Sequence, residues 1–176
     1  TTGYMLFKRF NRSISKTSPG VASQNRPSII FRLADFYLIY AEVANEVNPS
    51  DSRVLTYLNL VRERAGLPKV EILNPGIVGN KELQRAAIQR ERQIELATEG
   101  QRYFDVRRWM IADKDGEGRQ NGYAHGMNVR GTINDTEEFN RVVETEKIVF
   151  NRKMYLQPIP DHEMRKTQNL VQNPGW

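Results

Sequence analysis

The strongest constraint on the fold is a pair of helix-period apolar segments joined by a tight turn. In residues 32–47 apolar side chains recur three and four positions apart, which is typical of one face of an α-helix. Pro49 ends this helix, because proline disfavours helical geometry in the residue before it. Ser50 or Asp51 can cap a second helix over residues 51–65. The sequence predicts an αα-hairpin close to the roughly 34-residue span of a tetratricopeptide unit, although periodicity alone fits any helical hairpin.

The first predicted helix is apolar on more than one side. Leu38 and Ile39 lie off the expected core stripe, which consists of Leu33, Phe36, Tyr37, Tyr40, Ala44 and Val47. A helix that is apolar nearly all round is expected to be buried on both flanks. We therefore expect an exposed apolar patch that includes Leu38 and Ile39 if the chain stands alone, with self-association or a need for a partner.

The rest of the chain predicts two more principal helices and little sheet. A long helix is expected over 81–99 and a shorter one over 102–111. The many glycines and acidic residues of 113–136 predict a loop. Short strands are expected at 147–150 and 154–156, with a last short helix near the end of the chain. The 176 residues are thus predicted to form one mainly α domain of packed helices, long loops and a few short strands.

Composition and motifs exclude several kinds of chemistry. The chain has no cysteine, which rules out disulfides, thiol catalysis and cysteine-based zinc sites within it. Its net charge of +5 is a mild surplus. The basic segment 102–109 carries aromatic residues at core-like spacing, so no nucleic-acid partner is predicted. No phosphate-binding glycine motif and no nucleophile elbow occurs, and no cofactor is predicted.

One acidic segment matches the first half of a calcium-binding loop. Asp113, Asp115 and Glu117 occupy positions 1, 3 and 5 of such a loop, where alternate oxygens surround the ion. The last position would be Ala124, which cannot supply the bidentate carboxylate. A solvated acidic turn is therefore favoured over a calcium site at these residues.

Two glutamates on the predicted 81–99 helix are candidate functional residues. Glu91 and Glu95 lie one turn apart, on or beside the apolar stripe. Two carboxylates so placed could act as the acid and base of a glycoside hydrolase. Alternatively they form structural ion pairs, because an unpaired buried charge is strongly destabilising. The ion-pair interpretation is favoured, since nothing else in the chain completes a catalytic set. Candidate partners are Arg32, Arg62, Arg64, Arg102 and Arg107.

Motifs spread over nearly the whole chain form a specific set. They are Arg32-Leu33-Ala34-Asp35 with Tyr40-Ala41-Glu42, Tyr57-Leu58-Asn59, Arg64-Ala65-Gly66-Leu67-Pro68, Glu91-Arg92 with Glu95-Leu96, the string from Glu99 to Trp109, Tyr155-Leu156-Gln157-Pro158-Ile159-Pro160, and Gln172-Asn173-Pro174-Gly175-Trp176. Taken together they resemble the C-terminal part of the SusD/RagB family of outer-membrane lipoproteins from Bacteroidetes.

The resemblance implies a mostly helical, tetratricopeptide-like protein at the cell surface, held by a lipidated N-terminal cysteine that lies outside this chain. Such proteins cap a TonB-dependent, SusC-like outer-membrane transporter and capture glycans or other nutrients for it, without catalysis. Residues 1–176 would then be the C-terminal domain of a longer protein. The preceding hairpins of the remaining N-terminal part would cover the exposed face of the first helix.

Three hypotheses of function follow. The chain is part of a nutrient-binding protein, a glycoside hydrolase using Glu91 and Glu95, or a helical protein-interaction module. Sugar would be held by aromatic faces, with polar groups reading the hydroxyls. No motif locates the ligand-binding residues; Tyr123 and His125, in the glycine-rich loop, are the candidates proposed.

Overall fold

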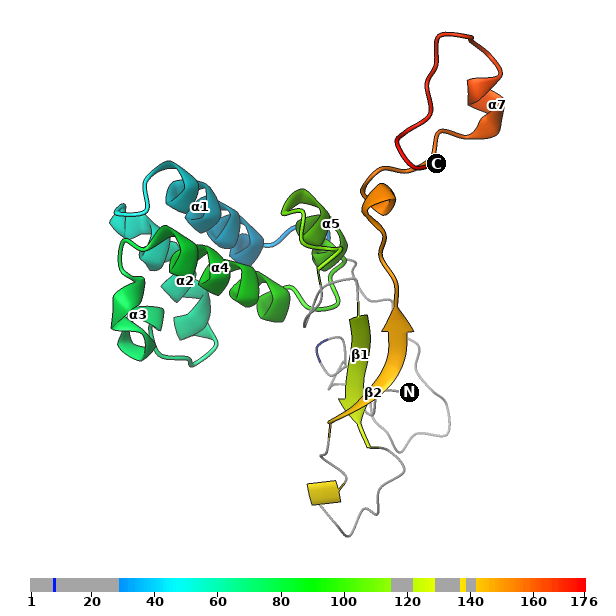
Figure 1. Cartoon of the computed structure of the whole chain (residues 1–176). Coiled ribbons are helices and arrows are strands. Elements are labelled where there is room, and N and C mark those ends of the chain that lie inside the picture. Colours follow the sequence, from blue (N-terminus) through cyan, green and yellow to red (C-terminus); the bar gives the residue numbers. More distant parts are fainter. Residues whose placement is uncertain (1–7, 9–28, 115–121, 129–136, 139–141) are drawn as a thin grey trace, which may run out of the picture. The chain divides into compact units, whose positions relative to one another are not determined.

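A computed structural model describes residues 8, 29–114, 122–128, 137–138 and 142–176 of the chain (Figure 1). The chain divides into two compact units. The helical unit consists of residues 27–105, and the C-terminal unit combines residues 1–26 with residues 106–176. Over the described residues, no helix is both long and apolar enough to cross a membrane.

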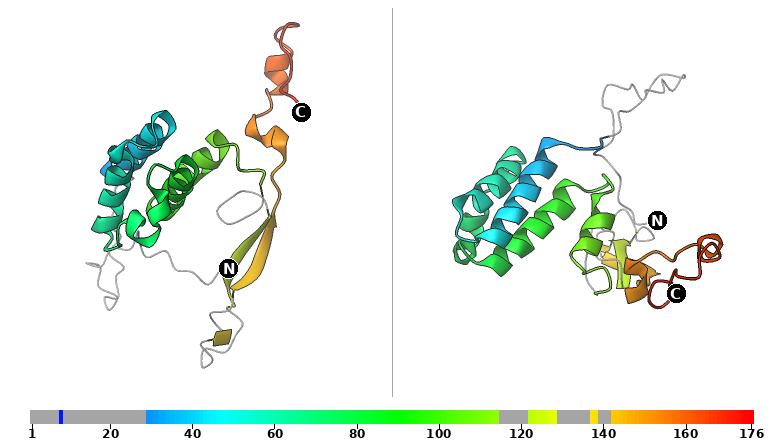
Figure 2. Two further views of the ribbon diagram at one scale, coloured as in Figure 1. Left: turned by 60° about the vertical axis from the view of Figure 1, so that its left-hand side comes forward. Right: turned by 90° about the horizontal axis from the view of Figure 1, so that it is seen from above.

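The helical unit is built on the predicted αα-hairpin. Its first helix packs against the second and also against a long later helix, as both views of Figure 2 show. In chain order the elements are α1 (Leu33–Val47), α2 (Ser52–Arg64), α3 (Val70–Leu73), the 3₁₀ turn η1 (Pro75–Ile77), α4 (Lys81–Glu95) and α5 (Gln101–Arg108), the last of which runs on into the C-terminal unit. The predicted mainly helical fold is confirmed.

Side-chain caps fix where the two long helices after the turn begin. The Asp51 carboxylate accepts a hydrogen bond from the Arg53 backbone N–H (2.9 Å) at the start of α2. The Asn80 side chain accepts one from the Leu83 N–H (3.2 Å) at the start of α4. Each bond satisfies a backbone donor that has no partner within the helix, and such caps are worth about 1 kcal/mol.

Helix α4 ends at Glu95, earlier than the predicted end at residue 99. Two residues explain the difference. Thr98 has φ 67° and Gly100 has φ 85°, and a right-handed helix cannot include either conformation. The apolar periodicity indicates a helix, but it does not indicate where the backbone adopts a left-handed conformation.

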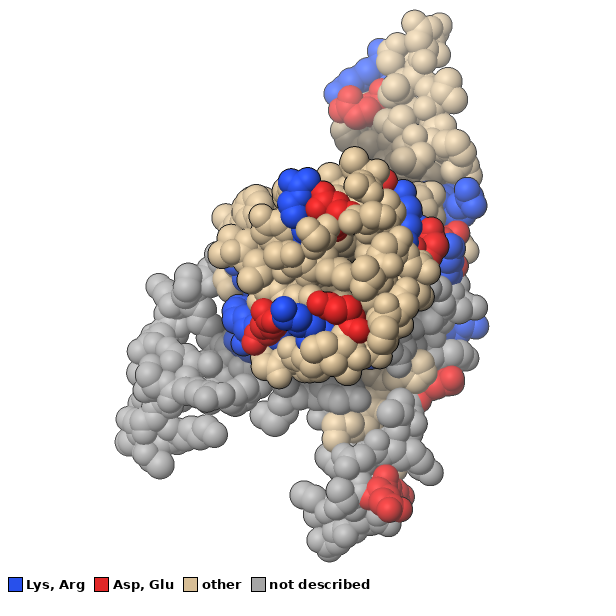
Figure 3. Space-filling model, turned by 90° about the vertical axis from the view of Figure 1, so that its left-hand side faces the viewer, with Lys and Arg blue, Asp and Glu red and all other residues tan. Residues whose placement is uncertain are grey.

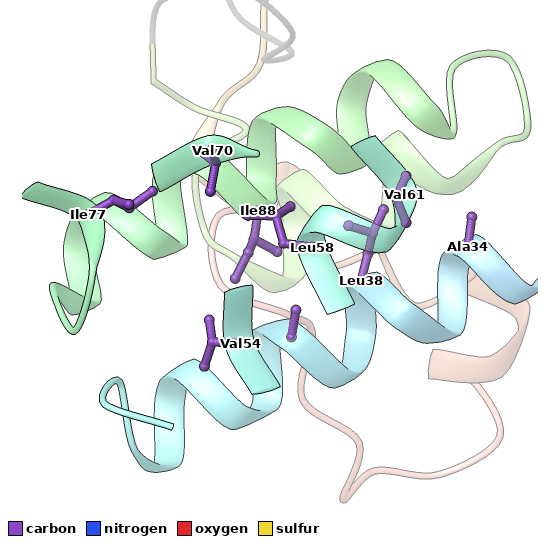
Figure 4. Close-up of a cluster of buried hydrophobic side chains, with 9 residues drawn as sticks. Ala34, Leu38, Val54, Leu58, Val61, Val70, Ile77 and Ile88 are labelled. Carbon is purple, nitrogen blue, oxygen red and sulfur yellow. The ribbon is translucent and has the colours of Figure 1, made fainter. Parts of the chain in front are cut away.

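The core of the helical unit is one cluster of apolar side chains between α1, α2 and α4 (Figure 4). Fully burying a leucine or isoleucine contributes about 1.5–3 kcal/mol. The segment from residue 70 to residue 77, between the two predicted helices at 51–65 and 81–99, forms α3 and η1 and supplies two of the members. The buried set is Ala34, Leu38, Ala41, Val54, Leu58, Val61, Val70, Ile77 and Ile88.

The predicted core stripe of α1 is largely wrong. The helix buries the face formed by Ala34, Asp35, Leu38, Ala41 and Asn45. Most of the larger apolar residues face outward, including Leu33 (63% exposed), Phe36 (56%) and Val47 (81%). The reason is that α1 carries two apolar stripes, and the one with small residues allows close packing against α2 and α4.

The expected exposed patch therefore has different members. Leu38, which the sequence predicts to be exposed in the isolated chain, is completely buried in the core, so this prediction is wrong. Ile39 is 41% exposed and lies on the outer face. Within the described residues, the outer face of α1 consists of Leu33, Phe36, Ile39, Tyr40, Val43 and Val47.

The C-terminal unit contains a two-stranded antiparallel sheet, a 3₁₀ turn and a short helix. Three predictions fail here. Strand β1 (Gly122–Met127) lies inside the predicted loop 113–136. It pairs with β2 (Val142–Ile148), which is distant in the sequence, so local sequence patterns do not reveal the strand. Residues 154–156, predicted to be a strand, instead overlap the 3₁₀ turn η2 (Arg152–Tyr155), and the predicted strand at 147–150 overlaps only the end of β2.

This unit has a small apolar core. Val106, Ala112 and Phe150 are buried together, and Tyr155 packs against them with its ring 5.0 Å from that of Phe150. The short helix α7 (Asp161–Met164) lies near the predicted position. Among the residues of this unit that the structure describes, Val106, Ala112 and Phe150 form the buried apolar cluster.

Candidate functional site

Three charged residues meet in the interior of the helical unit. Arg92, on α4, donates from Nη1 to Asp35 on α1 (2.8 Å). Its Nε and Nη2 donate to the two carboxylate oxygens of Asp105 on α5, at 2.9 and 3.1 Å. Each of the three residues is only 3% exposed. We call this set the Arg92 trio; it joins three helices through one guanidinium.

The helix positions explain the trio. Asp35 lies in the first turn of α1 and Arg92 in the last turn of α4, where the helix dipoles favour a negative and a positive charge respectively. A planar guanidinium can bind one carboxylate in a two-bond fork and still donate to another. Removing one partner of such a buried pair typically costs 3–5 kcal/mol, because a charge is left without compensation.

Glu91 lies one residue earlier on α4 and contacts α2. Its carboxylate accepts a hydrogen bond from Arg62 Nη1 at 2.8 Å, and the side chain is 5% exposed. Arg62 also donates from Nε to the carbonyl of Pro68 (3.1 Å). The structure thus brings Glu91 together with one of the arginines named from the sequence.

Glu95 and Glu99 bind arginines at the start of α1 and at the end of α2. Glu95 accepts hydrogen bonds from Arg32 and from Arg64, and Arg32 Nε also donates to Glu99 at 2.7 Å. Burial acts to lower the pKa of Arg32, but the hydrogen bonds to Glu99 and Glu95 outweigh it and raise that pKa. Figure 3, with the helical unit toward the viewer, likewise shows acidic and basic side chains next to one another on its surface.

The arrangement of the α4 glutamates does not match that of a hydrolytic pair. A groove of about 500 Å³ runs between the end of α2, α3 and α4, and Glu91 lines it beside Arg62 and Arg90. Glu95 is not among the residues that line this groove. A glycosidase needs two carboxyl groups that flank one bound sugar, whereas these two point to different arginines.

The other two arginines named from the sequence lie on α5. Arg102 is half-buried in the helical unit. Arg107 belongs to the C-terminal unit, and its guanidinium carbon lies 5.0 Å from the ring centroid of Phe150. The structure therefore places Arg107 on an aromatic face.

The two ligand-binding candidates lie on a strand. In β1, Tyr123 is opposite Lys147 and His125 is opposite Glu144, with a register shift between Ala124 and His125. His125 is exposed. Because the backbone here is paired, the prediction that these residues sit in a loop is wrong; their role in binding stays a proposal.

Of the calcium candidates, the structure describes only Asp113. Its carboxylate accepts a hydrogen bond from the Tyr155 hydroxyl at 2.5 Å, which lowers the pKa of Asp113. Asp115 and Glu117 lie outside the described residues. No group of three or more potential metal-binding side chains occurs in the part of the chain that the structure describes.

The two motifs near the end of the sequence bind each other. The Gln172 side chain exchanges two hydrogen bonds with the Ile159 backbone, at 2.8 and 2.9 Å. Asn173 Nδ2 donates to the Gln157 carbonyl at 2.6 Å. The Trp176 indole N–H lies 3.1 and 3.0 Å from the carbonyl oxygens of Lys153 and Leu156. We call these contacts, made by residues 172–176, the C-terminal clasp.

Comparison with known proteins identifies the family. A family model described as the SusD family matches residues 1–176. The chain belongs to the SusD family. Its relatives include the SusD-like protein P2 of Formosa agariphila, which is 31% identical over 84% of this chain and 26% of the relative. The SusD-like protein P25 of the same organism is 44% identical over 60% of this chain and 19% of the relative.

Solved structures agree with the SusD assignment. The selenomethionine form of BT4246 superposes with a TM-score of 0.69 at 34% identity, covering 87% of this chain and 25% of that protein. A SusD-like protein from Bacteroides fragilis gives a TM-score of 0.67 at 30% identity, over 85% of this chain and 26% of that one. The chain therefore spans about a fifth to a quarter of the length of these SusD relatives.

The sequence interpretation missed the Arg92 trio, although all three residues lie within the quoted SusD motifs. An arginine and two aspartates carry no signal of contact by themselves. The signal that could have found them is the phase of α1: once Ala34, Leu38 and Ala41 are taken as the buried face, Asp35 lies beside the core.

Proposed function

We propose that the chain is the C-terminal portion of a surface nutrient-binding protein that captures glycans for a TonB-dependent, SusC-like outer-membrane transporter. The observation that carries this proposal is the SusD family match over the whole chain. Relatives in Formosa and Bacteroides support the same role in this chain's parent protein. A cell-surface position through an N-terminal lipid anchor, outside residues 1–176, is part of the proposal.

The contacts on α4 support binding without catalysis. The Glu91 carboxylate is held by Arg62, and Glu95 is held by Arg32 and Arg64. Each carboxylate is held by its own arginine contacts, so the two are not positioned to flank one glycosidic bond. We propose that both glutamates are structural.

The outer face of α1 supports the view that these residues pack against the rest of a longer protein. Phe36 and Val43 are 56% and 57% exposed on it, opposite the side that packs on α2 and α4. A row of large apolar side chains of this kind is expected to be covered. Because the matched SusD relatives are several times longer than this chain, we propose that their preceding helices supply the cover.

The proposal is tested with the full-length protein. We expect it to bind oligosaccharides in a glycan array, to release no reducing ends from them, and to co-purify with a SusC-like transporter. Glu91→Gln should lower thermal stability, because it weakens the contact with Arg62. Like the wild type, the variant should release no reducing ends from the oligosaccharides. Hydrolysis that disappears in Glu91→Gln, with stability intact, would establish the hydrolase alternative instead.

A second function is favoured by the apolar face of α1, namely a helical protein-interaction module. Analytical ultracentrifugation of residues 1–176 separates the cases when combined with the glycan array. Self-association of the isolated chain, together with a monomeric full-length protein that binds glycans, supports the nutrient-binding role. A full-length protein that binds no glycan but captures a protein partner through Phe36 and Val43 supports the module.

A further inference from the structure

The C-terminal unit contains a hollow of about 600 Å³ that the proposed function does not use. Its walls come from the last turn of α5 and the segment after it, from η2, and from the C-terminal clasp. Much of the lining is apolar: Met110, Tyr155, Leu156 and Pro174 all contribute. Met110 is 48% exposed and Leu156 is 52% exposed, so the apolar surface is open to a ligand.

Three cations share this lining. Arg107, Arg152 and Lys153 are among its residues, and none of the lining residues that the structure describes is acidic. Two of the cations are positioned by aromatic rings. The Arg107 guanidinium lies 5.0 Å from the centroid of Phe150, and Lys153 Nζ lies 4.2 Å from that of Trp176. A ring holds a cation in place without supplying a negative charge.

The Asp113 carboxylate interacts with two residues of the lining, Tyr155 and Arg152. It accepts a hydrogen bond from the Tyr155 hydroxyl, with 2.5 Å between the two oxygens, and interacts electrostatically with Arg152. Asp113 acts on Arg152, while the ammonium of Lys153 lies over the Trp176 ring and no described lining residue is acidic. The Tyr155 hydroxyl is engaged with Asp113, so its ring rather than its hydroxyl is available to the hollow.

The C-terminal clasp fixes the shape of the hollow. Gly175 has φ 86°, a conformation that suits glycine, and a side-chain carbon added there would lie 3.0 Å from Lys153 Cβ. The two hydrogen bonds from the Trp176 indole to the carbonyls of Lys153 and Leu156 fix the end of the chain against η2. The cations and the apolar surface are therefore held in one geometry before a ligand arrives.

We propose that this hollow binds an anionic sugar residue, one that carries a carboxylate or a sulfate ester. The apolar lining fits the C–H face of a sugar ring, and Arg107, Arg152 and Lys153 fit the anionic substituent. The inference rests on the proposed glycan-binding role and deepens it by naming the class of glycan.

The experiment measures oligosaccharide binding to the full-length protein by isothermal titration calorimetry. The probes are oligogalacturonate for carboxylate, carrageenan oligosaccharides for sulfate ester, and neutral galactan oligosaccharides. We expect at least one anionic probe to bind more tightly than the neutral one, and its affinity to fall as salt rises from about 50 to 500 mM. Arg152→Gln should weaken that binding about tenfold, the usual effect of losing one charge-assisted contact.

Arg165→Gln is the matched control. Arg165 is an exposed cation of the same unit on the turn after α7, so this change alters net charge equally but lies outside the hollow. It should leave the affinity unchanged. Met110→Ser removes apolar lining and should weaken anionic probes without changing the salt dependence.

The outcomes separate this inference from the proposed function. If neutral probes bind as well as anionic ones and Arg152→Gln has no effect, the anion site is wrong and glycan binding stands. If anionic probes bind but both arginine variants leave their affinity unchanged, they bind elsewhere and the site is wrong. If no probe and no other glycan binds, both proposals fail.

Discussion

The two units of this SusD chain obtain their order in different ways. The helical unit has a core of nine buried apolar residues and places ion pairs at its helix junctions. In the C-terminal unit the described residues include a buried cluster of three, and the last residues are held by side-chain amides and an indole that bind backbone carbonyls and an N–H. Over the described residues, burial organises the first unit, and directed hydrogen bonds hold the end of the second.

The difference predicts how each unit responds to substitution. Burial and buried charge resist change strongly, because a cavity or an uncompensated charge affects the whole unit. Hydrogen bonds at an exposed chain end contribute only about 0.5–1.5 kcal/mol each. Damage to the helical unit should therefore unfold it, whereas damage to the C-terminal clasp should loosen a few residues. Four measurements test this contrast, with the largest expected effect first.

Arg92→Ala should have the largest effect. It leaves the buried carboxylates of Asp35 and Asp105 without their shared partner, and we expect a loss of about 3–5 kcal/mol in unfolding free energy. Urea denaturation of the full-length protein gives the value. Arg53→Ala, which removes an exposed guanidinium paired with Asp51, should cost under about 1 kcal/mol. Equal losses in the two variants would contradict the role given to burial.

Leu58→Ala should follow. Leu58 is completely buried between α1, α2 and α4, and the cavity should cost about 2–5 kcal/mol. The matched control is Leu60→Ala, since Leu60 is 41% exposed on the same helix. The same denaturation assay should show a loss several times smaller for the control. A control loss as large as that of Leu58→Ala would mean that Leu60 is covered in the full-length protein.

Trp176→Ala tests the C-terminal clasp. It removes the indole donor to the Lys153 and Leu156 carbonyls and the ring beneath the Lys153 ammonium. We expect a local loss of about 1–2 kcal/mol. Hydrogen exchange should become faster for backbone amides in 152–157 and stay unchanged in α1, α2 and α4. Faster exchange throughout the helical unit would show that the two units are stabilised together.

The smallest effect concerns Glu46, at the end of α1. Hydrogen bonding to Arg85 is the main cause that lowers the Glu46 pKa from 4.5 to about 2. Because the folded-state pKa is lowered, the stabilisation is fully present above pH 4.5 and is lost as the pH falls from 4.5 toward 2. The Glu46 side chain is 41% exposed, so solvent screening keeps the effect small.

The stability of wild type and Glu46→Gln should therefore differ slightly at pH 6, and the difference should shrink as the pH falls from 4.5 toward 2. Thermal melts at low and high salt provide the measurement, since salt should reduce the difference at pH 6. A difference that grows as the pH falls would contradict the assigned direction of the pKa shift.

Sequence reasoning found the elements better than it found their faces. The periodicity of 32–47 and the turn at Pro49 identify α1 and α2, because local spacing and local stop signals suffice for that. It placed the core stripe of α1 on the wrong side, because two apolar stripes are present and only the packing partners decide between them. Strand β1 was missed for a similar reason, since its order depends on a partner strand about twenty residues away.

The contacts at the candidate site could also be predicted only in part from the sequence. Arginine partners for Glu91 and Glu95 could be named from the need to neutralise half-buried carboxylates, but Arg92, Asp35 and Asp105 could not be matched without the three-dimensional arrangement. The contacts of the C-terminal clasp could not be predicted either. Its two motifs were quoted as separate strings, and only the structure shows that Gln172 and Trp176 bind the first of them.

The Arg92 trio also restricts how these proteins can diverge. Replacing Arg92 by an uncharged residue leaves two buried carboxylates without their shared donor, whereas replacing one aspartate leaves Arg92 paired with the other. Loss of the arginine alone is therefore the most costly of these single changes. In an alignment of full-length homologues, loss of the arginine should coincide with replacement of both aspartates by uncharged residues.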